Sequence, residues 1–209
     1  RRPGAALLRG RASFRGFSSL RPSITSTDRG RGSKVAARER REGRVPGMLY
    51  GDHKHVLPIS TCMTELTAHL KRRDFKCAIM DLVLPDGSGS CRVIPRAVEY
   101  DFKTRKPTYV TFQRWPEDLK RYPQKVPIPI VATNAEFCVG VKAGGSLIYI
   151  FDEWTCRVYD EPIPAVIELD ASPLEIGVAV KLSSVKLPEH VKPMPRGQLV
   201  DPPLIKVIK

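Results

Sequence analysis

Short apolar runs of strand length recur along this 209-residue chain, with turn-forming residues between them, which leaves few places for a long helix. Apolar runs of this kind cover residues 45–50, 55–60, 76–84, 91–100 and 108–115. The four-residue connection 51–54 is short enough for a β-hairpin. The pattern predicts a mainly β fold with a few short helices.

One segment of the first half has helical periodicity. Three apolar residues fall on one face at spacings of three and four: Met63, Leu66 and Leu70. Ser60 or Thr61 is a suitable N-cap, and the basic run that ends at Arg73 suits the last turn of a helix. The sequence therefore predicts a helix from this cap to Arg73, and a further single helical turn over residues 116–122.

The composition shifts near residue 123, where we place a domain boundary. Strand-length runs follow at residues 126–133, 146–151, 155–159, 165–169 and 179–186. Prolines at 127 and 129, and again at 162 and 164, restrict their segments to sheet edges or strand ends. Residues 140–145, GVKAGG, lack the Gly-Lys-Ser/Thr ending of a phosphate-binding loop and predict a β-turn. Residues 170–174 predict a short helical turn capped by Asp170 or Ser172.

Positive charge is concentrated towards the N-terminus. The formal net charge is +13, and residues 1–44 carry 13 Lys or Arg against three acids. Residues 125–209 carry nine basic and ten acidic residues. This gradient favours an anionic partner for the first part of the chain, such as nucleic acid, and leaves the last part near neutral.

The first 27 residues are rich in Arg, Ser and small residues and contain no acid. Such a composition is typical of a mitochondrial targeting segment. We expect residues 1–33 to form a basic arm in which Arg9, Arg11 and Arg15 pair with RNA phosphates. The alternative is a retained leader that lies on a neighbouring surface.

The sequence offers no catalytic or metal-binding set. Its five cysteines, at positions 62, 77, 91, 138 and 156, form no Cys-x-x-Cys motif, which indicates reduced thiols rather than a zinc site. His53 and His55 lack further ligands, and no nucleophile and base stand out. No apolar run approaches the roughly 20 residues of a membrane span. We expect no enzyme activity, no cofactor, no metal, no small-molecule substrate and no membrane partner.

Residues 38–51, RERREGRVPGMLYG, resemble the opening signature of the large-ribosomal-subunit protein twenty-five family. Members carry an Arg-rich segment, a Gly-Lys/Arg-x-Pro-Ala/Gly step and an apolar strand ending in Tyr-Gly. The resemblance continues through ELTAHL, CRVIPRAVEYDF and PTYVTFQRW. KVPIPIVATNAEFCVGVKAGGSLIYIF, EPIPAVIELDASPLEIG and KLSSVKLPEHV resemble the second domain of the long form, which is called CTC in bacteria. The resemblance as a whole covers residues 34 to 192.

The resemblance implies a six-stranded β-barrel with flanking helices, which binds 5S ribosomal RNA, and a C-terminal β-rich domain. We assign residues 34–122 to the RNA-binding barrel, residues 123–200 to the second domain and residues 201–209 to a tail. The near-neutral second domain is expected to meet neighbouring large-subunit proteins.

The resemblance also indicates which residues contact RNA. It places a basic rim of four arginines where the chain enters the barrel, and Tyr50 at the end of the strand that follows; the rim consists of Arg38, Arg40, Arg41 and Arg44. An arginine fork can contact phosphate in two places or stack on a base. Glu39 and Glu42 are expected to orient these arginines. The alternative is a solvated helix end whose Arg/Glu pairs face water.

Two departures from the family pattern bear on RNA recognition. Bacterial members usually have His-x-Asp-Phe on the last long barrel strand, where this chain has Tyr109-Val110-Thr111-Phe112. Tyr109 and Thr111 thus occupy the positions that the family associates with 5S contact. Glu39 stands where Leu is typical. We therefore expect either 5S RNA or another ribosomal RNA element as the ligand.

These observations predict a structural constituent of the mitochondrial large ribosomal subunit, located in the matrix, that binds ribosomal RNA. One alternative is a free RNA-binding stress factor that associates transiently with 5S RNA or ribosomes. An RNA-processing enzyme is a third reading, for which the sequence supplies no catalytic residues.

Overall fold

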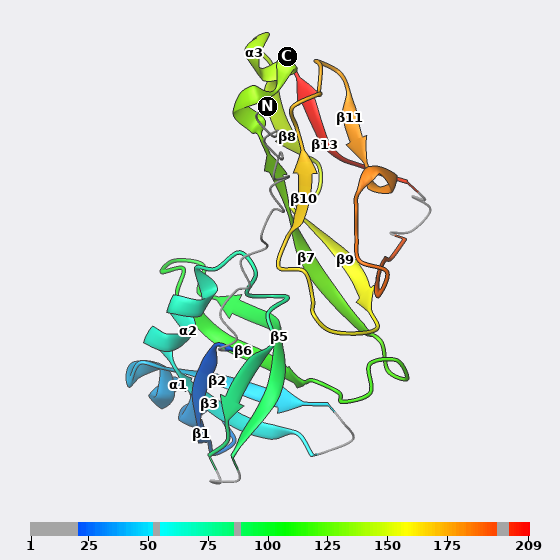
Figure 1. Ribbon diagram of the computed structural model, residues 1–209. Helices are drawn as coiled ribbons and strands as arrows, with labels where there is room; N and C mark the ends of the chain where they lie inside the picture. The colour runs from blue at the N-terminus through cyan, green and yellow to red at the C-terminus, as the bar shows by residue number, and fades with distance from the viewer. Residues whose placement is uncertain (1–20, 52–54, 86–88, 196–200) are drawn as a thin grey trace, which may run out of the picture.

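The computed structural model describes residues 21–51, 55–85, 89–195 and 201–209. The chain forms a β-barrel, which is followed by a second β-rich part (Figure 1). This arrangement confirms the predicted mainly β fold with short helices.

Six strands close the barrel in the order β1-β3-β2-β6-β5-β4. They are β1 (Ser23–Asp28), β2 (Arg44–Tyr50), β3 (Leu57–Cys62), β4 (Met80–Val83), β5 (Ser90–Tyr100) and β6 (Pro107–Arg114). The β1–β4 and β2–β6 pairs are parallel, and the other four pairs are antiparallel. The predicted six-stranded barrel is confirmed.

The barrel interior follows from alternation along the strands. Val45 and Leu49 on β2 and Val110 and Phe112 on β6 are fully buried and belong to one apolar cluster. Gly47 lies between the two β2 residues and pairs with Val110. A Cβ at Gly47 would lie 2.5 Å from the Val110 carbonyl oxygen, so only glycine allows this approach of the two strands.

The barrel begins earlier than residue 34. Residues 23–28, which the sequence analysis assigns to the arm, form β1, which pairs with β3 and β4 and closes the ring. Only Ile24 on β1 has an apolar side chain in the core, so the segment lacks the apolar alternation that marks the other strands. Its strand conformation is set by the neighbouring strands, which supply its backbone partners.

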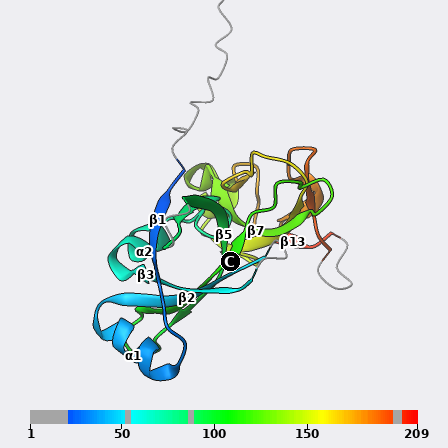
Figure 2. The ribbon, with the colours of Figure 1, turned by 90° about the horizontal axis from the view of Figure 1, so that it is seen from below.

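Two helices lie on the outside of the barrel. They are α1 (Ser33–Arg41) and α2 (Met63–Leu70), and Figure 2 shows α1 beside β2. The predicted helix over residues 60–73 is too long at both ends, and its predicted caps are wrong. Ser60 and Thr61 belong to β3, where they pair with Pro46 and Val45 of β2, and each is about 1% exposed.

The second part contains two further sheets, in the orders β10-β7-β9-β12 and β11-β13-β8. Their strands are β7 (Gln124–Thr133), β8 (Ser146–Tyr149), β9 (Glu153–Val158), β10 (Ile167–Asp170), β11 (Ala179–Lys181), β12 (Val191–Pro193) and β13 (Pro203–Ile208). Short helices are η1 (Ala135–Phe137), α3 (Val139–Lys142) and η2 (Leu182–Ser184).

β7 is an inner strand of its sheet, but the part of β7 that contains Pro127 and Pro129 is an edge, as predicted. β7 pairs with β9 through residues 124–129 and with β10 only through residues 130–133. Both prolines therefore stand where β7 has one neighbour, and their missing N–H groups interrupt no second ladder.

Two local predictions for the second half are wrong. The residues of GVKAGG contribute to α3, and Gly140 packs so closely that a Cβ would lie 2.8 Å from Val207. Residues 203–208, assigned to a tail, form β13, the central strand of its sheet.

Two predicted helical turns are present as single turns that do not extend into helices. The Tyr122 N–H donates to the Asp118 carbonyl at 3.0 Å. Asp170 accepts hydrogen bonds from the N–H and hydroxyl of Ser172, as expected of a cap, and the Leu174 N–H donates to the Ala171 carbonyl at 3.2 Å.

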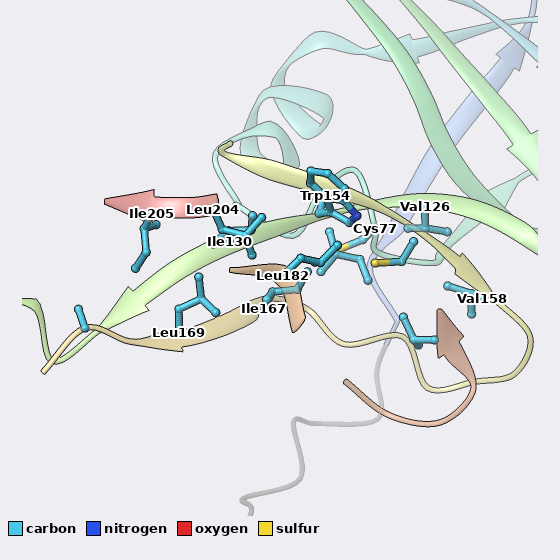
Figure 3. Packing of buried hydrophobic residues seen from close by; sticks show 14 of the residues in the cluster. Cys77, Val126, Ile130, Trp154, Val158, Ile167, Leu169, Leu182, Leu204 and Ile205 are labelled. Atoms are coloured by element: carbon cyan, nitrogen blue, oxygen red, sulfur yellow. The ribbon is translucent and has the colours of Figure 1, made fainter. Parts of the chain in front are cut away.

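One apolar core joins the barrel to the second part. Val93 and Ile94 are neighbours on β5 and point to opposite faces, so Val93 packs inside the barrel while Ile94 packs with the second part. Cys77, which precedes β4, belongs to the same cluster as Ile94, and Figure 3 shows it among side chains of the second part such as Trp154. The two parts are thus held by buried apolar surface rather than by a linker alone.

Candidate nucleic-acid interface

The outer face of β6 carries two of the predicted RNA contacts, Tyr109 and Thr111. Tyr109 and Thr111 are half-buried and alternate with the fully buried Val110 and Phe112, so both point away from the barrel core. On the adjacent strand, Met48 pairs with Thr111 and is exposed. Tyr109 and Thr111 therefore share one surface of the barrel.

Helix α1 lies against this barrel wall through its uncharged side and one acid. Glu39 is buried, and its Oε2 accepts a hydrogen bond from the Ser60 hydroxyl at 2.8 Å. Ser60 pairs with Pro46, which places the helix over β2 and β3. The prediction that Glu39 orients arginines is wrong, because Glu39 is buried and its carboxylate accepts from Ser60 on β3.

The opposite side of α1 presents cations to solvent. Arg38, Arg40 and Arg41 fall in its last turn and are exposed. The helix dipole favours cations at this end of a helix. Oε1 of Glu42 lies 3.7 Å from Nε of Arg38, as expected if Glu42 orients this arginine. Among the described residues, nothing forms a hydrogen bond or ion pair with the Arg41 guanidinium.

Arg40 joins the helix to the β6 surface. Its Nε donates to the Thr108 carbonyl oxygen at 3.0 Å, one residue before Tyr109. Arg44 turns the other way, since its Nη1 donates to the Thr27 hydroxyl on β1 at 3.2 Å. The four-arginine rim therefore divides, with Arg40 beside Tyr109 and Arg44 directed over β3.

Tyr50, the last residue of β2, is half-buried and pairs with Gln113. Its hydroxyl interacts with the Arg96 guanidinium, whose pKa is lowered by burial, an effect that Tyr50 partly offsets. Arg96 also donates to Gln113 and Gln124 and to the Lys125 carbonyl. Tyr50 thus lies where the outer face meets the second part.

Sequence reasoning missed the turn between β5 and β6. Residues 101–106, DFKTRK, place Phe102 on the surface with 86% of its area exposed, beside Lys103, Arg105 and Lys106. The Thr104 hydroxyl and the Lys103 N–H donate to the Asp101 carboxylate and hold its pKa below its usual range. The sequence signal that could have indicated this site is an aromatic residue within a basic turn. It is easily missed because the strands on both sides dominate the sequence pattern.

Other predicted residues lie outside the described residues. These are Arg9, Arg11 and Arg15 of the arm, and His53. Within the described ranges, no three His, Cys, Asp or Glu side chains gather in a way that could hold a metal ion. No disulfide joins the five cysteines, all of which are described. None of the described helices is long and apolar enough to cross a membrane.

Comparison with known proteins assigns both parts of the chain. The sequence model of the Ribosomal L25p family matches residues 24–112, and that of the ribosomal protein TL5 C-terminal domain matches residues 123–208. The large ribosomal subunit protein bL25 of Rhodopseudomonas palustris (strain BisB18) is 40% identical over 177 residues, which cover 84% of this chain and 72% of that protein. The chain belongs to the Ribosomal L25p family.

Further relatives match this chain over a similar length. The proteins named large ribosomal subunit protein bL25 from Jannaschia sp. (strain CCS1) and Nitrobacter hamburgensis are each 36% identical to this chain. They cover 81% and 84% of it, and the matched regions cover 76% and 74% of those proteins. The resemblance drawn from the sequence is confirmed. Because L25p proteins are ribosomal components, membership also confirms the interpretation that the chain is not an enzyme.

Proposed function

We propose that this chain is a structural constituent of the mitochondrial large ribosomal subunit and binds ribosomal RNA through the outer face of its barrel. Its L25p membership supports a structural ribosomal role with ribosomal RNA binding. The observation that carries the position of the interface is the hydrogen bond from Arg40 to the Thr108 carbonyl. It places a cationic helix end beside the Tyr109 and Thr111 surface.

The chemistry of this surface suits a structured RNA. Exposed arginines supply phosphate contacts, whose contribution depends on salt but not on sequence. Tyr109 offers a ring and a hydroxyl, and Thr111 offers one short hydroxyl. We propose Arg38, Arg40, Arg41 and Arg44 as phosphate contacts, and Tyr50, Tyr109 and Thr111 as contacts to sugar or base. The element bound is 5S RNA or another ribosomal RNA element.

A binding experiment tests the interface. Arg40→Ala in the full chain is expected to weaken binding to large-subunit ribosomal RNA and to lower the salt slope by about one phosphate contact. Lys186→Ala removes one exposed cation of the second part and serves as the control. Equal losses for the two variants would contradict this position for the interface.

We propose that the second part meets neighbouring large-subunit proteins. Its end farthest from the barrel carries exposed apolar side chains, among them Phe137, Val139, Ile148 and Ile208. Exposed apolar groups next to a near-neutral segment favour a protein partner over a phosphate backbone. Cross-linking of assembled subunits is expected to join this end to protein. Cross-links from it to RNA alone would contradict the proposal.

The mitochondrial location rests on the composition of residues 1–27, which carry arginines and serines but no acid. We further propose that Arg9, Arg11 and Arg15 contact RNA. Deleting residues 1–20 should then flatten the salt slope by roughly 0.7–0.9 per lost phosphate contact. An unchanged slope would assign the arm to targeting or to a protein surface.

Two cellular measurements separate the remaining alternatives. Import of the full chain into isolated mitochondria tests the location, and failure to enter would overturn it. Sedimentation with large subunits through high salt is expected for a constituent, whereas release would favour the transient RNA-binding factor.

A further inference from the structure

The turn between β5 and β6 presents a phenyl ring that packs against nothing substantial in this chain. Phe102 is 86% exposed, more than any other large apolar side chain in the described residues, and the preceding Tyr100 is 51% exposed. Burying such a side chain against a partner is favourable, because it removes apolar surface from water. The ring is therefore available to a binding partner.

The turn holds this ring on an ordered backbone. The Asp101 N–H donates to the Lys106 carbonyl at 2.9 Å, and the Arg105 N–H donates to the Asp101 carbonyl at 2.8 Å. The Asp101 carboxylate accepts from the Lys103 N–H at 3.1 Å and from the Thr104 hydroxyl at 2.6 Å. A ring on a preorganised turn loses less conformational entropy on binding than a ring on a mobile loop.

The turn that carries the ring also carries three cations. Lys103, Arg105 and Lys106 are all exposed, while the carboxylate oxygens of the one acid in the turn accept hydrogen bonds from within the turn. Arg105 keeps this place although its φ is 55°, a left-handed conformation that costs energy in a residue with a Cβ. Protein-binding surfaces are depleted of charged residues at their core and of lysine in particular. The charge here matches phosphate.

The turn adjoins the interface described above. Thr108, whose carbonyl accepts from Arg40, follows the turn by two residues, and Tyr109 follows by three. A nucleic acid that contacts Arg40 and Tyr109 can therefore extend to the turn without leaving the barrel.

We propose that Phe102 stacks on an unpaired base of the bound RNA, while Lys103, Arg105 and Lys106 contact its flanking phosphates. This inference rests on the proposed RNA-binding function. A base within a continuous A-form duplex is stacked on both faces and offers no surface to a phenyl ring, whereas a bulged or looped base does. Stacking tolerates any base, so the turn recognises the unpaired state rather than a sequence.

The test uses the full chain and a two-stranded RNA duplex without a loop that carries 2-aminopurine in a single-nucleotide bulge. Phe102→Ala is expected to weaken binding by roughly 5- to 150-fold, the usual range for loss of one base–aromatic stack. It should also abolish the change in 2-aminopurine fluorescence on binding. Phe102→Trp should retain both signals, whereas Phe102→Leu, which keeps apolar volume without a ring, should lose the fluorescence change.

The same duplex without the bulge serves as the matched probe, and wild type and Phe102→Ala should bind it equally. Arg40→Ala should weaken binding to both duplexes. If Arg40→Ala weakens binding but Phe102→Ala does not, the stacking inference fails while the proposed function stands. If wild type binds neither duplex nor ribosomal RNA, the proposed function fails. If Phe102→Leu behaves as wild type, the contact needs apolar volume and no ring, and the stacking inference is overturned.

Discussion

The indole N–H of Trp115 donates to Oε1 of Glu161 at 2.8 Å, and this hydrogen bond joins the end of the barrel to the second part of the chain. The Arg92 guanidinium lies 2.9 Å from the same oxygen. Trp115 is buried, while Arg92 and Glu161 are each about one-third exposed. One carboxylate thus satisfies two donors at this junction.

Removing this carboxylate should destabilise the chain. Glu161→Ala leaves the buried Trp115 N–H without its acceptor, which is expected to cost about 1–3 kcal/mol in the free energy of unfolding. Urea denaturation measures the loss. Glu153→Ala is the control, because the Lys76–Glu153 pair has side chains 57% and 45% exposed and should contribute less than about 1 kcal/mol. Equal losses would show that the junction does not depend on Glu161.

Truncation should distinguish the arm from β1. A chain that starts at residue 34 lacks β1, so β3 and β4 lose their shared neighbour and the site of Ile24 is empty. We expect loss of cooperative thermal unfolding for this variant. A chain that starts at residue 21 keeps β1 and should unfold cooperatively. A cooperative transition in the shorter chain would mean that the barrel closes without β1.

The buried Glu39–Ser60 hydrogen bond offers a double-mutant cycle. Glu39→Leu alone leaves the Ser60 hydroxyl without its acceptor, at an expected cost of about 1–3 kcal/mol. Adding Ser60→Ala removes the orphaned group, so the double variant should recover most of that stability. Chemical denaturation of the four proteins measures the coupling. Additive losses would contradict a direct interaction.

Buried thiols should make the chain sensitive to alkaline pH. Burial raises the pKa of Cys77 to about 12 and that of Cys156 to about 11, from an ordinary value of 9.0. Above pH 9 the unfolded thiols lose protons that the folded thiols retain, so the free energy of unfolding falls as pH rises. The expected slope is about 1.4 kcal/mol per pH unit for each thiol until the folded thiol ionises. The Cys77→Ala/Cys156→Ala variant should have a flatter pH profile between pH 9 and 11, and an unaltered profile would refute this origin.

The β6 departure should affect RNA specificity. A His and a carboxylate can read base edges, a combination that Tyr109 and Thr111 cannot reproduce. We expect the unaltered chain to discriminate poorly between bacterial 5S RNA and an unrelated structured RNA of equal length. Tyr109→His with Thr111→Asp should improve discrimination by about 1–3 kcal/mol if one base contact is restored. Competition binding at fixed salt measures it, and a strong 5S preference of the unaltered chain would contradict the prediction.

The sequence by itself determined the strands whose side chains alternate. Val110 and Phe112 on β6 are two positions apart and both buried, and Val45 and Leu49 on β2 are four apart and both buried. Such spacing marks one face of a strand that packs in the core. The same rule placed Tyr109 and Thr111 on one surface. The Arg-rich segment before β2 likewise indicated a cationic helix end, since exposed charge needs no tertiary partner.

Only the tertiary structure decided which segments complete a sheet and where charged side chains point. β1 carries one core apolar residue, and the strand is stabilised by backbone pairing with β3 and β4, which are distant in sequence. Glu39 lies inward because Ser60 supplies a donor, while Arg40 and Arg44 diverge because Thr108 and Thr27 supply acceptors on opposite sides. These partners come from other strands, and a hydrogen bond between distant segments leaves no periodic pattern in the sequence.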